Sequence, residues 1–129
     1  MTHPHPNGLT LLGGISHPQY QALEGAWDHW GAESQMDMVI EESAELTHAI
    51  LTARRHDMVW SYAVVEELAD LLICLQQIEI QMQHQSVLYG STLWDQVLDI
   101  RDAKMGRLQA RLEEAREVER IAAEDREVA

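Results

Sequence analysis

Two short stretches of similar sequence decide the fold: they read EESAEL at residues 41–46 and EELADL at residues 66–71. Within each stretch two acids stand three positions apart, first Glu42 and Glu45, then Glu67 and Asp70. Residues at this spacing are neighbours on the surface of an α-helix. We therefore expect two helices, each presenting a pair of carboxylates among apolar residues.

Apolar residues at helical spacing extend outward from both stretches and predict four helices. The expected helices run from near Pro18 to Gly31, over residues 35–55 and 58–83, and from Leu93 into the charged end of the chain. Side chains suited to capping the helix starts are Ser16, Ser34 with Asp37, and Thr92 with Asp95. No segment shows sustained strand alternation. The chain is therefore expected to be all-α, as a bundle of four to five helices.

The 129 residues fit one domain with an addition at each end. Residues 1–16 hold two of the three prolines and three of the seven glycines, so we expect a mobile arm there. Residues 17–112 form the expected domain, and residues 113–129 form a charged helical extension. A domain this small leaves much apolar surface uncovered, which favours a homo-oligomer.

The net charge of −13, from 22 acidic and 9 basic residues, limits the partners of the protein. Such a surface repels nucleic-acid backbones and anionic membranes, so we expect neither as a partner. Small phosphorylated substrates remain suitable if metal ions first neutralise the acids. The single cysteine, Cys74, cannot form an intrachain disulfide, and residues 1–8 lack the basic and apolar regions of a signal peptide. Both features lead us to expect a cytoplasmic protein.

Folding the two acidic helices as a hairpin around His56 predicts that their carboxylates meet. Glu45 and Glu67 each lie 11 residues from His56, and Glu42 and Asp70 each lie 14 residues from it. Because each helical residue adds about 1.5 Å of rise, each pair sits at matching height. Like charges ~4 Å apart repel by about 4 kcal/mol at an effective dielectric constant of ~20. Such a cluster needs protons, basic partners or dications, and its oxygen ligands favour Mg²⁺, with Mn²⁺ as a substitute.

The order of these motifs resembles the MazG-like, all-α nucleoside triphosphate pyrophosphohydrolases, a superfamily that includes dimeric dUTPases and dCTP pyrophosphatases. The motif reads Glu42-x-x-Glu45, a spacer of 21 residues, then Glu67-x-x-Asp70. The flanks WGAESQMDMVIEESAELTHAI and EELADLLICLQQIEI, and the basic segment RDAKMGRLQARL, also match in order. Together they cover roughly residues 30–112.

The resemblance implies a MazG-like bundle that hydrolyses nucleoside triphosphates to a nucleoside monophosphate and pyrophosphate, in a bacterium or a phage-infected host cell. It makes Glu42, Glu45, Glu67 and Asp70 the Mg²⁺ ligands and Glu41 an auxiliary acid that orients the attacking water. It makes Lys104 a phosphate-facing catalytic lysine helped by Arg107 and Arg111, and it implies a homodimer or homotetramer. The family's usual asparagine and Tyr-Pro after this lysine are replaced by Gly106-Arg107-Leu108. Contacts of this helix with base and sugar are therefore in doubt.

Two further residues are candidates for contacting the nucleotide. Trp30, just before the first acidic helix, could stack on the base, although a Trp at helical spacing more often packs in a core or interface. Gln35 lies about two turns before Glu42 on roughly the same face. The sequence does not identify the base or the sugar.

Other interpretations stay open. The acids could simply face solvent, and Arg101, Lys104, Arg107 and Arg111, which share one helix face, could pair with nearby acids such as Asp102 or with another subunit. Glu45-x-x-His48 is the motif of di-iron carboxylate bundles, which need two copies of it. A non-catalytic helical regulator that binds nucleotides or proteins is the remaining alternative.

Overall fold

The computed structural model describes residues 13–87 and 90–128. These residues form four helices: α1 (His17–Trp30), α2 (Ala32–Arg55), α3 (Tyr62–Gln83) and α4 (Leu93–Val128). Between residues 13 and 128, outside the gap at 88–89, the only β-type pairing is an isolated bridge between Ser86 and Thr92. The expected all-α class is confirmed, whereas residues 1–12 of the expected N-terminal arm lie outside the described residues.

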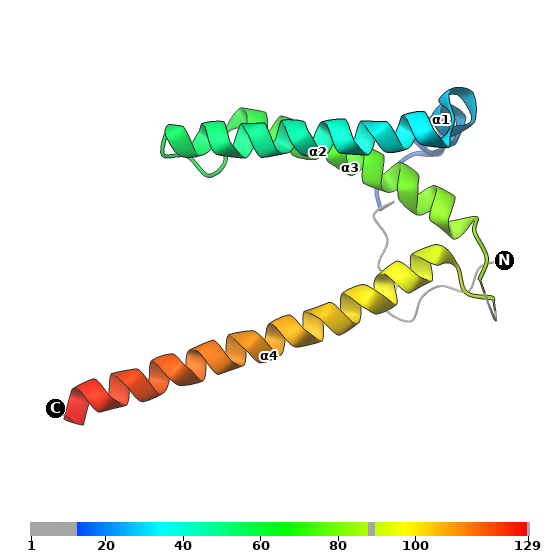
Figure 1. The fold of residues 1–129 in the computed structure, drawn as a ribbon. Coiled ribbons are helices and arrows are strands. Elements are labelled where there is room, and N and C mark those ends of the chain that lie inside the picture. The colour runs from blue at the N-terminus through cyan, green and yellow to red at the C-terminus, as the bar shows by residue number, and fades with distance from the viewer. Residues whose placement is uncertain (1–12, 88–89, 129) are drawn as a thin grey trace.

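The helices α2 and α3 form an antiparallel hairpin, and α1 lies across its open end in contact with both (Figure 1). The hairpin core sits near its closed end, where Ala49 and Ala53 of α2 are buried against Val64 of α3, with Leu46 packed beside them. Two alanines on one face let the helix backbones approach closely, because their side chains fill little space between the axes. This close approach positions the acidic stretches of the two helices side by side.

Two of the expected helix caps are confirmed. The backbone N–H of Gln19 donates to Ser16 Oγ at 3.2 Å, and the Ser16 N–H donates back to Gln19 Oε1 at 2.7 Å, which completes a capping box for α1. At α4, the Thr92 N–H donates to Asp95 Oδ2 at 2.7 Å, and the Asp95 N–H donates to Thr92 Oγ1 at 3.2 Å. Both helices therefore begin where their capping residues predict.

The expected starts of the two middle helices are wrong. The helix α2 begins at Ala32 instead of Gln35, because Gly31, at φ +90°, ends α1 and starts α2 in one residue; Ser34 then lies within the first turn. The helix α3 begins at Tyr62 instead of Met58, because Ser61 Oγ accepts the Val64 N–H at 3.2 Å. The apolar residues 58–60 extend the hydrophobic pattern, but they belong to an exposed connection.

The helix α4 leaves the hairpin and extends away from it (Figure 1). Its first turns contact α3, where Leu98 is buried, and α3 is the only one of the described helices that it contacts. From Ala103 to Val128 every residue is exposed, and the helix passes the expected domain boundary at residue 112 without a break. No helix in the described part of the chain combines the length and apolar composition that crossing a membrane requires.

Candidate metal centre

Three acids from the two hairpin helices converge at one place. One carboxylate oxygen from each of Glu42, Glu67 and Asp70 lies within 4.8 Å of the others, and all three side chains are half-buried. Glu42 comes from α2, and Glu67 and Asp70 from adjacent turns of α3. The equal distances of these residues from His56 thus do translate into matching heights along the hairpin.

Glu45 joins the cluster from one turn further along α2. It is more exposed than the other three acids, yet its carboxyl group lies close enough to Glu42 and Glu67 to raise the pKa of both. The structure therefore brings together all four carboxylates that the two motifs predict to meet. Glu41, in contrast, is exposed on α2 next to Glu42, and its carboxylate is not among the oxygens that converge.

The crowding of these acids changes their protonation. Burial, followed by the charges of Glu45 and Asp70, raises the pKa of Glu42 to about 7 from its usual 4.5. Burial and the neighbouring Glu45 carboxylate also raise the pKa of Glu67. Without a cation the site therefore retains protons near neutral pH, since removing them would concentrate negative charge in one half-buried layer.

Two oxygen atoms of the cluster are unsatisfied. Glu42 Oε2 and Glu67 Oε2 are buried, and within residues 13–87 and 90–128 neither has a hydrogen-bond partner. A buried polar atom without a partner is costly, and a buried carboxylate more so. Both atoms belong to the converging acids, so a bound cation at this place would satisfy them together. Oxygen donors of this kind fit Mg²⁺ or Mn²⁺.

The thiol of Cys74 stands one turn beyond Asp70. Burial, together with the negative charges of Glu42 and Asp70, raises its pKa above the usual 9.0. The thiol therefore stays protonated at neutral pH and does not act as a thiolate ligand. Its role here is that of a small packed side chain, which leaves the donor set of the cluster all-oxygen.

A pocket of about 450 Å³ opens beside the acids. Its walls are formed by both hairpin helices: Ala44, Glu45, His48, Ala49, Thr52, Ala63 and Glu67. Two carboxylates of the cluster thus face a space bounded mainly by small side chains. The sequence motifs identified the acids but not Thr52 or Ala63, whose place on the wall follows only from how the two helices face each other.

The expected nucleotide-contacting residues lie at the other end of the hairpin. Gln77, a buried residue of α3, donates through Nε2 to Gln35 Oε1 and to the Leu23 carbonyl oxygen, each at 3.0 Å. Gln35 is thereby fixed to α3 at the point where α1 also docks. Trp30 is 62% exposed at the end of α1 and makes an edge contact with the ring of His29. Sequence reasoning missed Gln77, because it stands in an otherwise apolar part of α3.

The basic residues of α4 are not at the acid cluster. Lys104, Arg107 and Arg111 are exposed and follow the part of α4 that contacts α3. Arg101 forms an ion pair with Asp102, with Arg101 Nη2 2.7 Å from Asp102 Oδ1. This is the alternative that the sequence left open for the basic stripe, the helix face that carries Arg101, Lys104, Arg107 and Arg111. Within one chain, the described residues thus assemble the carboxylates of the predicted site but not its cations.

Comparison of the chain with protein-family models, curated proteins and solved structures finds no match in any of the three.

Proposed function

We propose that this protein hydrolyses nucleoside triphosphates to a nucleoside monophosphate and pyrophosphate, with Mg²⁺ held by Glu42, Glu45, Glu67 and Asp70. The observation that carries the proposal is the convergence of carboxylate oxygens from α2 and α3 around two unsatisfied buried atoms. The resemblance of the motifs to MazG-like pyrophosphohydrolases supplies the reaction. Mn²⁺ is expected to substitute for Mg²⁺, since both take oxygen ligands.

The chemistry of the site supports this substrate class. A triphosphate is strongly anionic and would be repelled by four carboxylates, so a cation must offset their charge for the substrate to bind. A divalent cation bound there would offset this charge and lower the pKa of a coordinated water. An acid at the edge of the cluster could then accept a proton from the attacking water. Glu41 is our candidate for this acid by resemblance, from its exposed position beside Glu42.

The proposal requires the basic side chains that contact the triphosphate to come from the α4 helix of a second subunit. Since Lys104, Arg107 and Arg111 lie away from the cluster of their own chain, a triphosphate would meet them from a second subunit. This fits the homodimer or homotetramer that the resemblance implies. The pocket lined by Ala44, His48 and Ala63 gives the substrate space beside the acids. Trp30 and Gln35 remain our candidates for base contacts.

The experiment is a pyrophosphate-release assay with a panel of ribo- and deoxyribonucleoside triphosphates and Mg²⁺. We expect the wild type to turn over at least one nucleotide and Glu42→Gln and Asp70→Asn to lose that activity while keeping their circular dichroism spectrum. Glu66→Gln removes the same charge from an exposed neighbour of Glu67 and should stay active. No turnover with Mg²⁺ or Mn²⁺ would contradict the proposal, and nucleotide binding without hydrolysis would favour a non-catalytic regulator.

One observation favours a second candidate, a di-iron centre. His48 lines the same pocket as Glu45 and Glu67, so the Glu-x-x-His motif does face the site. Each chain has a single such motif on its hairpin, and a second copy of the chain would have to supply the other. Protein expressed in iron-rich medium should then contain iron, and protein without iron would rule this candidate out.

A further inference from the structure

The exposed part of α4 carries an apolar seam that no other part of the described chain covers. Met105, Leu108 and Leu112 follow one another at spacings of three and four residues and are 47–49% exposed. Ala115 continues the same face after a further three residues. Apolar residues that alternate at these spacings form the contact line of a coiled coil. From Ala103 onward α4 is exposed on all sides, so a seam of this kind indicates that another helix packs there.

Charge is divided unevenly along this helix. Residues 101–111 carry four basic side chains and one acid, for a net charge of +3, whereas residues 113–127 carry seven acids and three arginines, for a net charge of −4. A parallel copy of the helix would place like charge beside like charge. An antiparallel copy places the basic half of each helix beside the acidic half of the other, which lowers the electrostatic energy of association.

We propose that the partner of this seam is a second copy of the chain, whose α4 packs antiparallel along residues 101–119. In this register Leu112 packs against the partner's Leu108, and Met105 against the partner's Ala115. The same register places Arg101 opposite the partner's Glu119, and it brings Asp102 beside the partner's Arg116 on the flank of the seam. Charge favours the antiparallel orientation and the apolar residues set the register within it, and these two charged pairs agree with that register.

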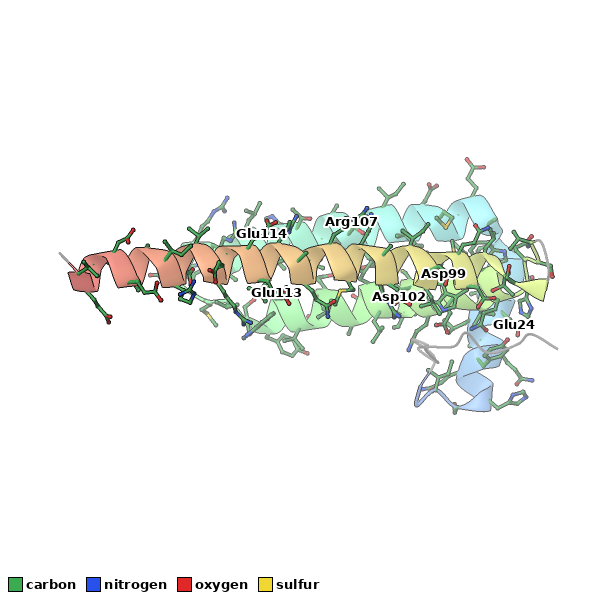
Figure 2. All side chains as sticks on the ribbon, turned by 90° about the horizontal axis from the view of Figure 1, so that it is seen from below. Glu24, Asp99, Asp102, Arg107, Glu113 and Glu114 are labelled. Atoms are coloured by element: carbon green, nitrogen blue, oxygen red, sulfur yellow. The ribbon has the colours of Figure 1, made fainter. Side chains whose placement is uncertain are left out.

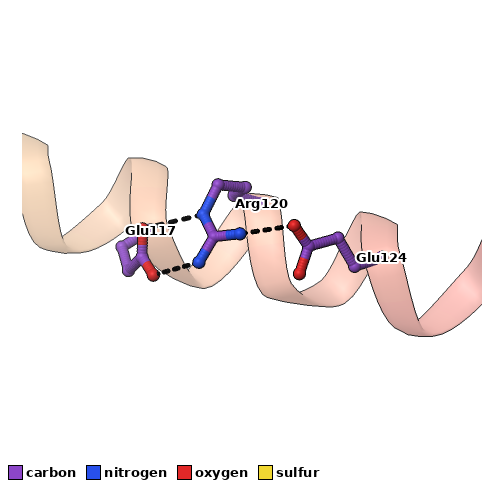
Figure 3. A network of polar contacts seen from close by, with 3 residues as sticks. All are labelled: Glu117, Arg120 and Glu124. Carbon is purple, nitrogen blue, oxygen red and sulfur yellow. Dashed lines mark hydrogen bonds and ion pairs between the residues drawn. The ribbon is translucent and has the colours of Figure 1, made fainter.

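The ion pairs that the extension makes within its own chain lie outside this seam. Arg120 bonds to Glu117, with Nε 3.0 Å from Oε2, and to Glu124 on the following turn (Figure 3). In the heptad that places Leu108 and Leu112 at the contact line, all three residues fall on the outer face. Exposed pairs of this kind stabilise a helix only modestly, because solvent screens them. They leave the apolar seam open to the second copy, whereas the ion pair between Arg101 and Asp102 rearranges when Arg101 meets the partner's Glu119.

The Figure 2 view shows the exposed length of α4 on which this pairing depends, with Arg107, Glu113 and Glu114 labelled along it. Glu113 and Glu114 occupy outer positions of the heptad, and they supply matched controls. Both this proposal and the proposed function need a second copy of the chain, but the variants below leave the acid cluster intact, so a failure of this pairing is distinguishable from a loss of activity.

The first test is cross-linking of the full chain in a Cys74→Ala background with a short bismaleimide. Gln109→Cys lies on the flank of the seam, one residue from the centre of the pairing at residue 110, so we expect efficient cross-linking of this variant to a dimer. Ala110→Cys, on the outer face, should give little. Ala122→Cys should also give little, because its own copy stands about 36 Å away along an antiparallel pair. Cross-linking through position 122 instead of 109 would show a parallel pair and overturn the proposal.

The second test is a charge exchange read by sedimentation equilibrium. Glu119→Arg should weaken association by about tenfold, since it sets two arginines against each other. Adding Arg101→Glu should restore association, because the exchanged pair is again complementary. Glu113→Arg makes the same charge change on the outer face and should have little effect. A wild-type chain that stays monomeric at every concentration, or an equal effect of Glu119→Arg and Glu113→Arg, would overturn the proposal.

Discussion

Glu42 of α2 and Asp70 of α3 meet across the hairpin, with one carboxylate oxygen of each within 4.8 Å of the other. Burial, followed by the charges of Glu45 and Asp70, raises the pKa of Glu42 to about 7. In the absence of a cation the cluster therefore retains protons near neutral pH. Binding a divalent cation to the same oxygens would release those protons, and the two states should differ in their response to pH.

The stability of the metal-free protein should fall as pH rises. The pKa of Glu42 is about 7 in the folded chain and near 4.5 when unfolded, so the folded state binds more protons in this interval. Its contribution to stability is complete below the unfolded value and is lost as pH rises through the folded value. Thermal unfolding in a chelator, followed from about pH 5 to about pH 8, should show a decreasing midpoint. A midpoint that increases over this range would contradict the description of the cluster.

Mg²⁺ should stabilise the fold, and more at high pH than at low pH. A ligand that binds only the folded state raises the unfolding midpoint with its concentration, and ionised carboxylates bind the cation better than protonated ones. The comparison is the Mg²⁺-induced shift in midpoint at about pH 5 and about pH 8. An equal shift in Glu67→Gln and wild type would show that the ion binds elsewhere.

Gln77 should be important for docking α1 onto the hairpin. Its Nε2 donates to Leu23 of α1 and to Gln35 of α2, and the side chain is buried. Gln77→Leu replaces the amide by a somewhat shorter apolar side chain and leaves two acceptors without a donor, which should cost about 1–3 kcal/mol. Urea unfolding measures this loss. An unchanged midpoint would mean that water replaces the amide without penalty.

Gly106→Ala should strengthen α4. Gly106 stands in the interior of the helix, and a Cβ added there would meet no atom within 4 Å. Replacing an exposed helical glycine by alanine typically gains about 0.5–1 kcal/mol, because glycine loses more backbone freedom on folding. Helix content followed by circular dichroism on heating should show a later loss of signal. Earlier melting in the variant would indicate that this glycine serves a bend or a contact in the assembly.

The hairpin and its acids are predictable because they depend on local spacing. Glu42 and Asp70 are placed by helical rise and by a short turn, and both are properties of the sequence around them. The caps at Ser16 and Thr92 are predictable for the same reason, since a capping side chain acts within three residues. The start of α3 is not predictable from hydrophobicity, because Val59 and Trp60 are as apolar as the helix that follows but lie in an exposed connection.

The position of the basic stripe could not be predicted in the same way. The side of α4 that carries Lys104 and Arg107 follows from the sequence, but the direction in which α4 leaves α3 depends on the turn before Thr92 and on packing around Leu98. Helical spacing therefore placed the cations on one face without showing that this face lies away from the acids of its own chain. A long-range relation of this kind depends on tertiary contacts that spacing does not encode.

The most direct test of the metal centre is titration of the metal-free protein with Mn²⁺, with the free ion followed by electron paramagnetic resonance. We expect saturable binding to the wild type, competition by Mg²⁺, and loss of this binding in Glu42→Gln and Glu67→Gln. The control Glu66→Gln removes one exposed acid beside the cluster and should bind as the wild type does. Binding of Mn²⁺ that is weak, non-saturable and equal in all four proteins would contradict the assignment of these carboxylates as a divalent-cation site.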